Sequence, residues 1–136
     1  MQEMPNCVGS PPMAPGETVL VVDDDAAVRS ALKFALEVEG FDVRVYADSA
    51  AVLAERALPS RACLIIDYRM PGMDGLELAE VLHARRVDLP IILISGRVNP
   101  QLRQRARKSG VTRVLEKPLS DATLVENIRD ALAGRP

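Results

Sequence analysis

Short apolar runs alternate with segments of helical periodicity along the chain from Thr18 onward. Residues 19–22 are entirely apolar, and the runs that precede Asp67 and Ser95 share this character. A short apolar run bounded by polar or turn residues is typical of a strand buried on both faces. We predict five strands, at residues 18–22, 42–46, 62–67, 90–94 and 111–115. The second alternates polar and apolar positions and is expected to be half exposed.

A helix is predicted after each strand. The first has an apolar stripe from Val28 to Leu36 and ends at Gly40. The later helices are predicted to begin near Ser49, Gly75, Asn99 and Ser120. The Ser49 helix is expected to be capped by that serine and to run to about Leu58. This alternation predicts an α/β fold with a parallel sheet and helices on both faces.

Composition adds limits to this prediction. The chain has 136 residues, of which 48% are hydrophobic and 26% charged, as expected for one globular domain with an aliphatic core. A formal charge of −2 does not favour nucleic acid as a direct partner. The sequence lacks an apolar run of the roughly 20 residues that cross a bilayer, so membrane insertion is not expected. Cys63 is predicted to be a buried hydrophobe, and the low cysteine content favours a reducing compartment, the cytoplasm.

The chain divides into a leader and a domain. Residues 1–16 are rich in proline and glycine and have no periodicity, so we expect a leader that is flexible or extended. Residues 17–134 are expected to form the domain.

Candidate chemistry gathers where the predicted strands end. Right-handed crossovers place the carboxyl ends of parallel strands at one edge of the sheet. The polar residues found there are Asp23, Asp24, Asp25, Asp67, Ser95, Glu116 and Lys117. Converging carboxylates suit Mg²⁺ or Mn²⁺, and a lysine with a hydroxyl can hold phosphoryl oxygens. The set indicates phosphoryl transfer onto a carboxylate, and Asp67 is the candidate acceptor.

Four stretches in order, residues 21–25, 66–75, 94–96 and 116–118, resemble the receiver domain of two-component response regulators, within the CheY-like superfamily and FixJ-like in flavour. The resemblance covers residues 18–132. It implies a flavodoxin-like, doubly wound sheet of five parallel strands in the order 2-1-3-4-5. It also implies a signalling switch rather than an enzyme that turns over external substrates.

The resemblance implies a role for each site residue. Asp67 would accept a phosphoryl group from the phosphohistidine of a sensor histidine kinase or a phosphotransfer protein. Asp24, Asp67 and the backbone carbonyl of Arg69 would bind Mg²⁺, and Asp23 would act through water. Lys117 would pair with the phosphoryl group and Ser95 would donate a hydrogen bond to it. The Lys117-Pro118 bond is expected to be cis. A downstream protein, or a second copy, would bind the face formed by the fourth helix, the fifth strand and the fifth helix.

One position departs from the receiver pattern. Receivers usually carry an aromatic residue three positions before the lysine, and here that position is Val114. Valine is stiff at χ1 and too short for an inward swing. The predicted fourth helix is also unusually basic, which suggests either a solvated face or a docking surface for an acidic partner; its basic residues are Arg103, Arg105, Arg107 and Lys108.

Two alternatives remain open. Val114 is compatible with a degenerate receiver that acts as a phosphorylation-independent interaction module. Asp23-x-Asp25 after a buried strand imitates the first motif of Mg²⁺-dependent phosphatases of the haloacid dehalogenase type, although that interpretation leaves the Asp67 motif unused. The single histidine, His83, is expected to be solvated near a helix end and not to take part in phosphotransfer.

Overall fold

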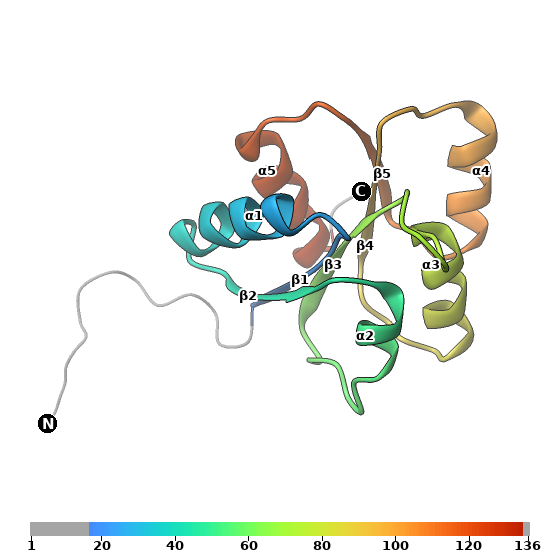
Figure 1. Ribbon diagram of the computed structural model, residues 1–136, viewed down its shortest axis with the longest axis horizontal. Coiled ribbons are helices and arrows are strands. Elements are labelled where there is room, and N and C mark those ends of the chain that lie inside the picture. The colour runs from blue at the N-terminus through green and yellow to red at the C-terminus, as the bar shows by residue number, and fades with distance from the viewer. Residues whose placement is uncertain (1–16, 135–136) are drawn as a thin grey trace, which may run out of the picture.

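The computed structural model describes residues 17–134, which form one five-stranded parallel sheet and five helices (Figure 1). The strand order β2-β1-β3-β4-β5 confirms the expected doubly wound, flavodoxin-like topology. The strands are β1 Thr18–Val22, β2 Asp42–Tyr46, β3 Ala62–Asp67, β4 Ile91–Ser95 and β5 Arg113–Glu116. The predicted leader, residues 1–16, lies outside the described residues.

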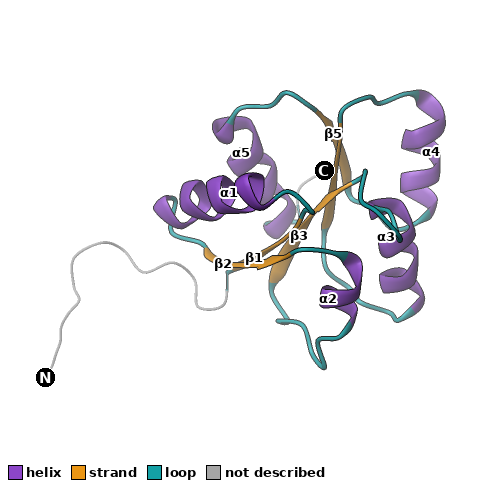
Figure 2. Cartoon of the chain, in the orientation of Figure 1, coloured by secondary structure: helices purple, strands orange, loops and turns teal. Residues whose placement is uncertain are grey.

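Helices cover both faces of the sheet, as the alternating pattern predicts (Figures 1 and 2). They are α1 Ala26–Val38, α2 Ser49–Leu53, α3 Gly75–Ala84, α4 Pro100–Lys108 and α5 Asp121–Leu132. Helices α1 and α5 lie on one face, and α2, α3 and α4 lie on the other.

Alternate residues of the central strands supply two separate cores. Leu64 and Ile66 of β3 pack with Leu76 of α3 on one face, whereas Cys63 and Ile65 pack toward α1 and α5 on the other. The strands therefore read as continuous apolar runs because both of their faces are covered. This burial fixes the register, since a shift by one residue would exchange the two faces.

Three boundary predictions in α2 and β5 were wrong. Asp48, not Ser49, caps α2, because its carboxylate accepts a hydrogen bond from the amide of Ala51 at 2.8 Å. The Ser49 hydroxyl is buried and donates to the carbonyl oxygen of Met73, and α2 ends at Leu53 rather than near Leu58. The fifth strand begins at Arg113, two residues later than predicted.

The other predicted caps are confirmed. Asn99 and Ser120 accept hydrogen bonds from the third amides of α4 and α5, and Pro100 opens α4. Gly40 follows α1 with a φ of 100°, the left-handed backbone that favours glycine. The Lys117-Pro118 bond is cis, as the resemblance implies.

Candidate functional site

Three carboxylates converge at the carboxyl edge of the sheet. Asp23 and Asp24 follow β1, and Asp67 is the last residue of the adjacent strand β3. Each offers a carboxylate oxygen within 4.8 Å of the other two. Asp67 and Asp23 are only 8% and 6% exposed, whereas Asp24 is exposed to solvent. The cluster therefore has a buried base and an open side.

Lys117, which directly follows β5, brings a positive charge to the three carboxylates. Its ammonium nitrogen lies 3.0 Å from a carboxylate oxygen of Asp67. The lysine is placed by the extension of β5, where its amide donates to the carbonyl oxygen of Ser95 at 2.8 Å. The lysine is nearly half exposed while Asp67 is buried, so the pair stands at the mouth of the site.

The electrostatics of Asp23 follow from its burial. Burial raises the pKa of the Asp23 carboxyl above its ordinary value of 3.8, and the neighbouring charge of Asp67 adds to this effect. The amide of Asp25 opposes the rise by donating to Asp23 at 2.9 Å. The site thus holds a carboxylate that a cation would stabilise.

Ser95 and Arg69 lie at or just beyond the ends of neighbouring strands near the cluster, but Ser95 is buried and Arg69 is exposed. Ser95 is buried at the end of β4, and its hydroxyl donates to the carbonyl oxygen of Arg97 at 2.9 Å. The Ser95 hydroxyl is therefore held by a hydrogen bond within its own turn. Arg69 is exposed two residues beyond Asp67, in a shallow hollow that also includes Tyr68 and Asp74.

Three supporting contacts were not anticipated from the sequence. Arg29 donates to the backbone carbonyl of Asp23 at 2.7 Å, which ties α1 to the acidic loop. Asp25 caps α1, accepting from the amides of Ala27 and Val28 at 2.9 and 3.3 Å. Because this carboxylate is engaged with the helix, the Asp23-x-Asp25 pattern has an explanation that does not require a phosphatase.

Gly75 is the third supporting residue. A Cβ at this position would collide with the carbonyl oxygen of Asp67 and would lie 2.9 Å from the Ile66 side chain. Its amide donates to the carbonyl oxygen of Tyr68 at 2.9 Å, so the turn after Asp67 closes directly against β3. Gly75 was predicted as a helix start, but its close approach depends on tertiary packing that the sequence does not reveal.

The donor set fits a hard divalent cation. Three carboxylates within 4.8 Å of one another offer the oxygen ligands that Mg²⁺ and Mn²⁺ prefer, and no histidine or cysteine lies among them. Burial is the main cause of the raised pKa of the Asp23 carboxyl, and the negative charge of Asp67 contributes less to it. Asp23, Asp24 and Asp67 are thus the residues able to hold such an ion.

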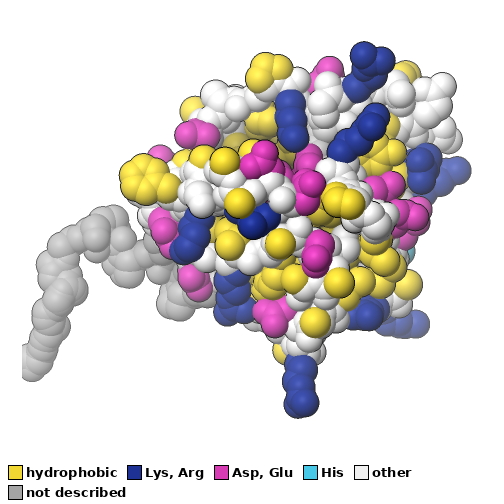
Figure 3. Space-filling model, in the orientation of Figure 1, with side chains coloured by type: hydrophobic (Ala, Val, Ile, Leu, Met, Phe, Trp, Pro, Cys, Tyr) yellow, Lys and Arg dark blue, Asp and Glu magenta, His cyan; other side chains and the backbone are white. Residues whose placement is uncertain are grey.

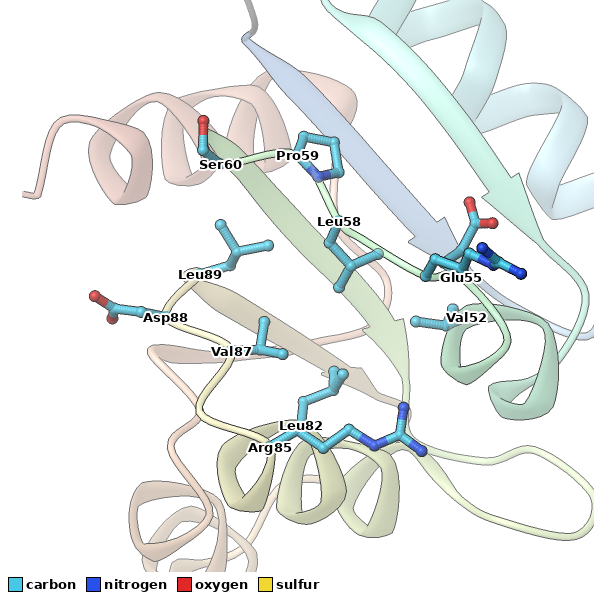
Figure 4. A pocket seen from close by; sticks show the side chains of 11 residues that line it. Val52, Glu55, Leu58, Pro59, Ser60, Leu82, Arg85, Val87, Asp88 and Leu89 are labelled. Carbon is cyan, nitrogen blue, oxygen red and sulfur yellow. The ribbon is translucent and has the colours of Figure 1, made fainter.

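Other predicted residues lie away from the cluster. Cys63 is fully buried in β3, and burial raises the pKa of its thiol to about 12, in agreement with a structural role. His83 is exposed in the last turn of α3, next to Gly110. A hollow of about 490 Å³ between the ends of α2 and α3 is lined by Leu58, Leu82 and Leu89 and contains none of the predicted site residues (Figure 4).

Val114 is the second residue of β5 and packs against the core on the side of α4. Next to it is a hollow of about 310 Å³ between α4, β5 and α5. Three arginines line this hollow, namely Arg103, Arg107 and Arg113. The short side chain of Val114 and the basic helix α4 therefore share one surface.

The chain is similar to known transcriptional regulators along most of its length. It is 40% identical over 114 residues to the transcriptional regulatory protein FixJ of Azorhizobium caulinodans, a match that covers 84% of this chain and 54% of that protein. FixJ of Bradyrhizobium diazoefficiens is 40% identical over 116 residues, covering 84% and 56%. The chain therefore spans about half the length of these relatives.

Two solved structures superpose on most of this chain. The crystal structure of FixJ-N superposes with a TM-score of 0.79 at 34% identity, covering 86% of this chain and 94% of that one. The chemotaxis protein CheY4 of Vibrio cholerae superposes with a TM-score of 0.77 at 26% identity, covering 85% and 98%.

In the described part, residues 17–134, no helix has the length and apolarity needed to cross a membrane.

The family model of the response regulator receiver domain matches residues 19–129, which include the acidic cluster, Asp67 and Lys117. With that match, the FixJ relatives and the strand order in agreement, the chain belongs to the response regulator receiver domain family.

Proposed function

We propose that this domain, residues 17–134, is a phosphorylation-controlled switch whose phospho-acceptor is Asp67. The observation that carries the proposal is the convergence of three carboxylates with Lys117, whose ammonium lies 3.0 Å from Asp67. The phosphoryl donor is the phosphohistidine of a sensor histidine kinase or a phosphotransfer protein. Because such donors act inside the cell, we place the protein in the cytoplasm.

In the proposed step, a carboxylate oxygen of Asp67 attacks the phosphorus of the phosphohistidine. The new oxygen–phosphorus bond forms as the nitrogen–phosphorus bond breaks, and the electron pair of that bond returns to the imidazole of the donor. Mg²⁺, held by Asp24, Asp67 and the Arg69 carbonyl with Asp23 acting through water, would neutralise phosphoryl oxygens when bound.

The other residues stabilise the product in this proposal. Lys117 neutralises Asp67 before transfer and remains within reach of a phosphoryl group attached to it. Ser95 releases its bond to the Arg97 carbonyl and donates to a phosphoryl oxygen instead. That exchange would move the loop after β4 and report phosphorylation to the surface formed by α4, β5 and α5, where a target protein or a second copy would bind.

Acetyl phosphate tests the proposal directly. We expect the protein to gain one phosphoryl group in the presence of Mg²⁺, measured by intact mass, and Asp67→Asn to gain none. Asp88→Asn is a matched control, because Asp88 is an exposed aspartate just before β4, at the opposite edge of the sheet. Absence of an adduct in the unchanged protein would favour the alternative of a phosphorylation-independent interaction module.

A further inference from the structure

An exposed apolar surface lies on the side of the molecule formed by α1 and α5. Phe34 and Val38 are 72% and 68% exposed, and they are the exposed large hydrophobic side chains among the described residues. They are four residues apart, so they lie on one side of α1. Figure 3 shows hydrophobic side chains protruding at the left of the molecule, where Figure 1 places α1.

This surface continues as a groove toward α5. Phe34, Ala35 and Val38 form one wall, Ala122 and Val125 form the other, and the hollow between them has a volume of about 870 Å³. We call these five residues the α1–α5 patch. The protein has only two phenylalanines, and Phe41 is buried while Phe34 is not. Phe34 and Val38 are the exposed large side chains of the patch, Ala35 is half-buried and Val125 is buried at its base. Exposed apolar side chains grouped beside a groove favour an interaction surface.

The rim of the patch argues against a second copy as its occupant. The ionisable residues at the rim are mainly acidic; they are Glu39, Asp121, Glu126, Arg129 and Asp130. A symmetric dimer sets the same surface against itself, so it would bring these carboxylates together. A segment with apolar side chains and little charge fits this rim better.

The leader of this chain has that composition. Residues 1–16 carry four prolines and several large apolar residues, with Glu3 as the one charged side chain. The apolar residues are Met1, Met4, Val8 and Met13. Proline-rich segments bind apolar, aromatic-lined grooves because little conformational entropy is lost on docking. Phe34 is the one aromatic among the described residues that line this groove, and Val38, Ala122 and Val125 supply the remaining apolar surface together with Ala35.

The leader also joins the domain close to the patch. The carbonyl oxygen of Glu17 accepts a hydrogen bond from the amide of Asp42 at 3.2 Å, and Asp42 follows the end of α1 by four residues. Residues 1–16 could extend roughly 50 Å at about 3.1 Å per residue. Helix α1 has 13 residues and is about 20 Å long, so the leader can reach the whole groove.

We propose that residues 1–16 dock on the α1–α5 patch of their own chain, with leader side chains packed against Phe34 and Val38. The leader then covers this surface and any other partner must displace it. This contact lies apart from Asp67 and does not depend on the proposed phosphorylation.

The two cysteines allow a direct test. Cys7 lies in the leader, while Cys63 is buried and the pKa of its thiol is about 12, so a nitroxide reagent will label Cys7 selectively. In the isotope-labelled full chain, we expect the nitroxide to reduce the amide signals of Phe34, Val38 and Val125 more than those of Leu78 in α3. Equal effects at both places, or none, would overturn the proposal.

Two variants separate docking from simple tethering. Phe34→Ser with Val38→Ser should restore the α5 signals, whereas the matched exposed pair Ala50→Ser with Ala51→Ser in α2 should leave them reduced. An unchanged pattern in the first pair would contradict docking. A mixture of isotope-labelled chains and separately nitroxide-labelled chains should show no loss; a loss at the patch would instead identify a second copy as the occupant.

Discussion

At the scale of single residues, the buried charge of Asp23 lowers the stability of the free protein but favours the binding of a cation. Its carboxylate is buried beside Asp67, and burial raises its pKa. We expect Asp23→Asn to stabilise the free protein at neutral pH, since the amide retains shape and acceptor but removes a desolvated charge. The same change should weaken Mg²⁺ binding by about tenfold or more, as loss of an outer ligand does. Titration calorimetry and thermal unfolding measure the two effects.

The pH dependence of these effects has a definite sign. Because the folded pKa of Asp23 is raised, the unchanged protein loses stability as the pH rises through that folded value, where the carboxyl becomes charged. The stability gained by Asp23→Asn should therefore shrink as the pH falls toward 3.8, the ordinary pKa. Mg²⁺ affinity of the unchanged protein should decline over the same range, because protons compete for the ligand. A gain that persists at low pH would contradict this account.

At the scale of elements, the start of α3 packs closely against the end of β3, the strand that carries Asp67. Gly75 approaches the Asp67 carbonyl so closely that a methyl group has no room. We expect Gly75→Ala to destabilise the fold by about 1–3 kcal/mol, as overpacking does, and to slow phosphorylation by displacing Asp67. Gly96→Ala is the matched control, because a Cβ there meets nothing within 4 Å, and it should change stability by less than about 0.5 kcal/mol. Equal losses in both variants would show that close approach is not the cause.

The same elements show what a sequence can predict. Strand positions and the edge that gathers Asp23, Asp67 and Lys117 follow from apolar runs and right-handed crossovers, and the structure agrees. The cap of α2 does not follow, since Asp48 and Ser49 are adjacent and both are chemically able to cap. The choice depends on the bond from Ser49 to Met73, a contact between segments 24 residues apart in sequence. The tight approach of Gly75 was missed for the same reason.

At the scale of the whole molecule, charge is distributed unevenly despite a net value of −2. Helix α4 has four basic residues and no acidic one, and two of them line the hollow beside Val114. We expect Arg103→Glu with Arg107→Glu to weaken binding of an acidic target, with an effect that diminishes at high salt. Affinity measured at low and high ionic strength tests this, and unchanged affinity at low salt would favour a merely solvated face.

Val114 lines the same hollow as Arg103 and Arg107. The hollow of about 310 Å³ next to it offers space for a larger ring. Because Val114 lies in β5 while Asp67, the proposed acceptor, lies at the end of β3, we expect Val114→Tyr to leave phosphorylation by acetyl phosphate unchanged. The ring should change only dimerisation or target binding, measured by sedimentation with and without acetyl phosphate. Val114→Ile, which adds volume without an aromatic ring, should resemble the unchanged protein. If Val114→Tyr alone lost the phosphoryl adduct, Val114 would be required for the structure of the phosphorylation site. Effects on the surface formed by α4, β5 and α5 could then not be separated from effects on phosphorylation.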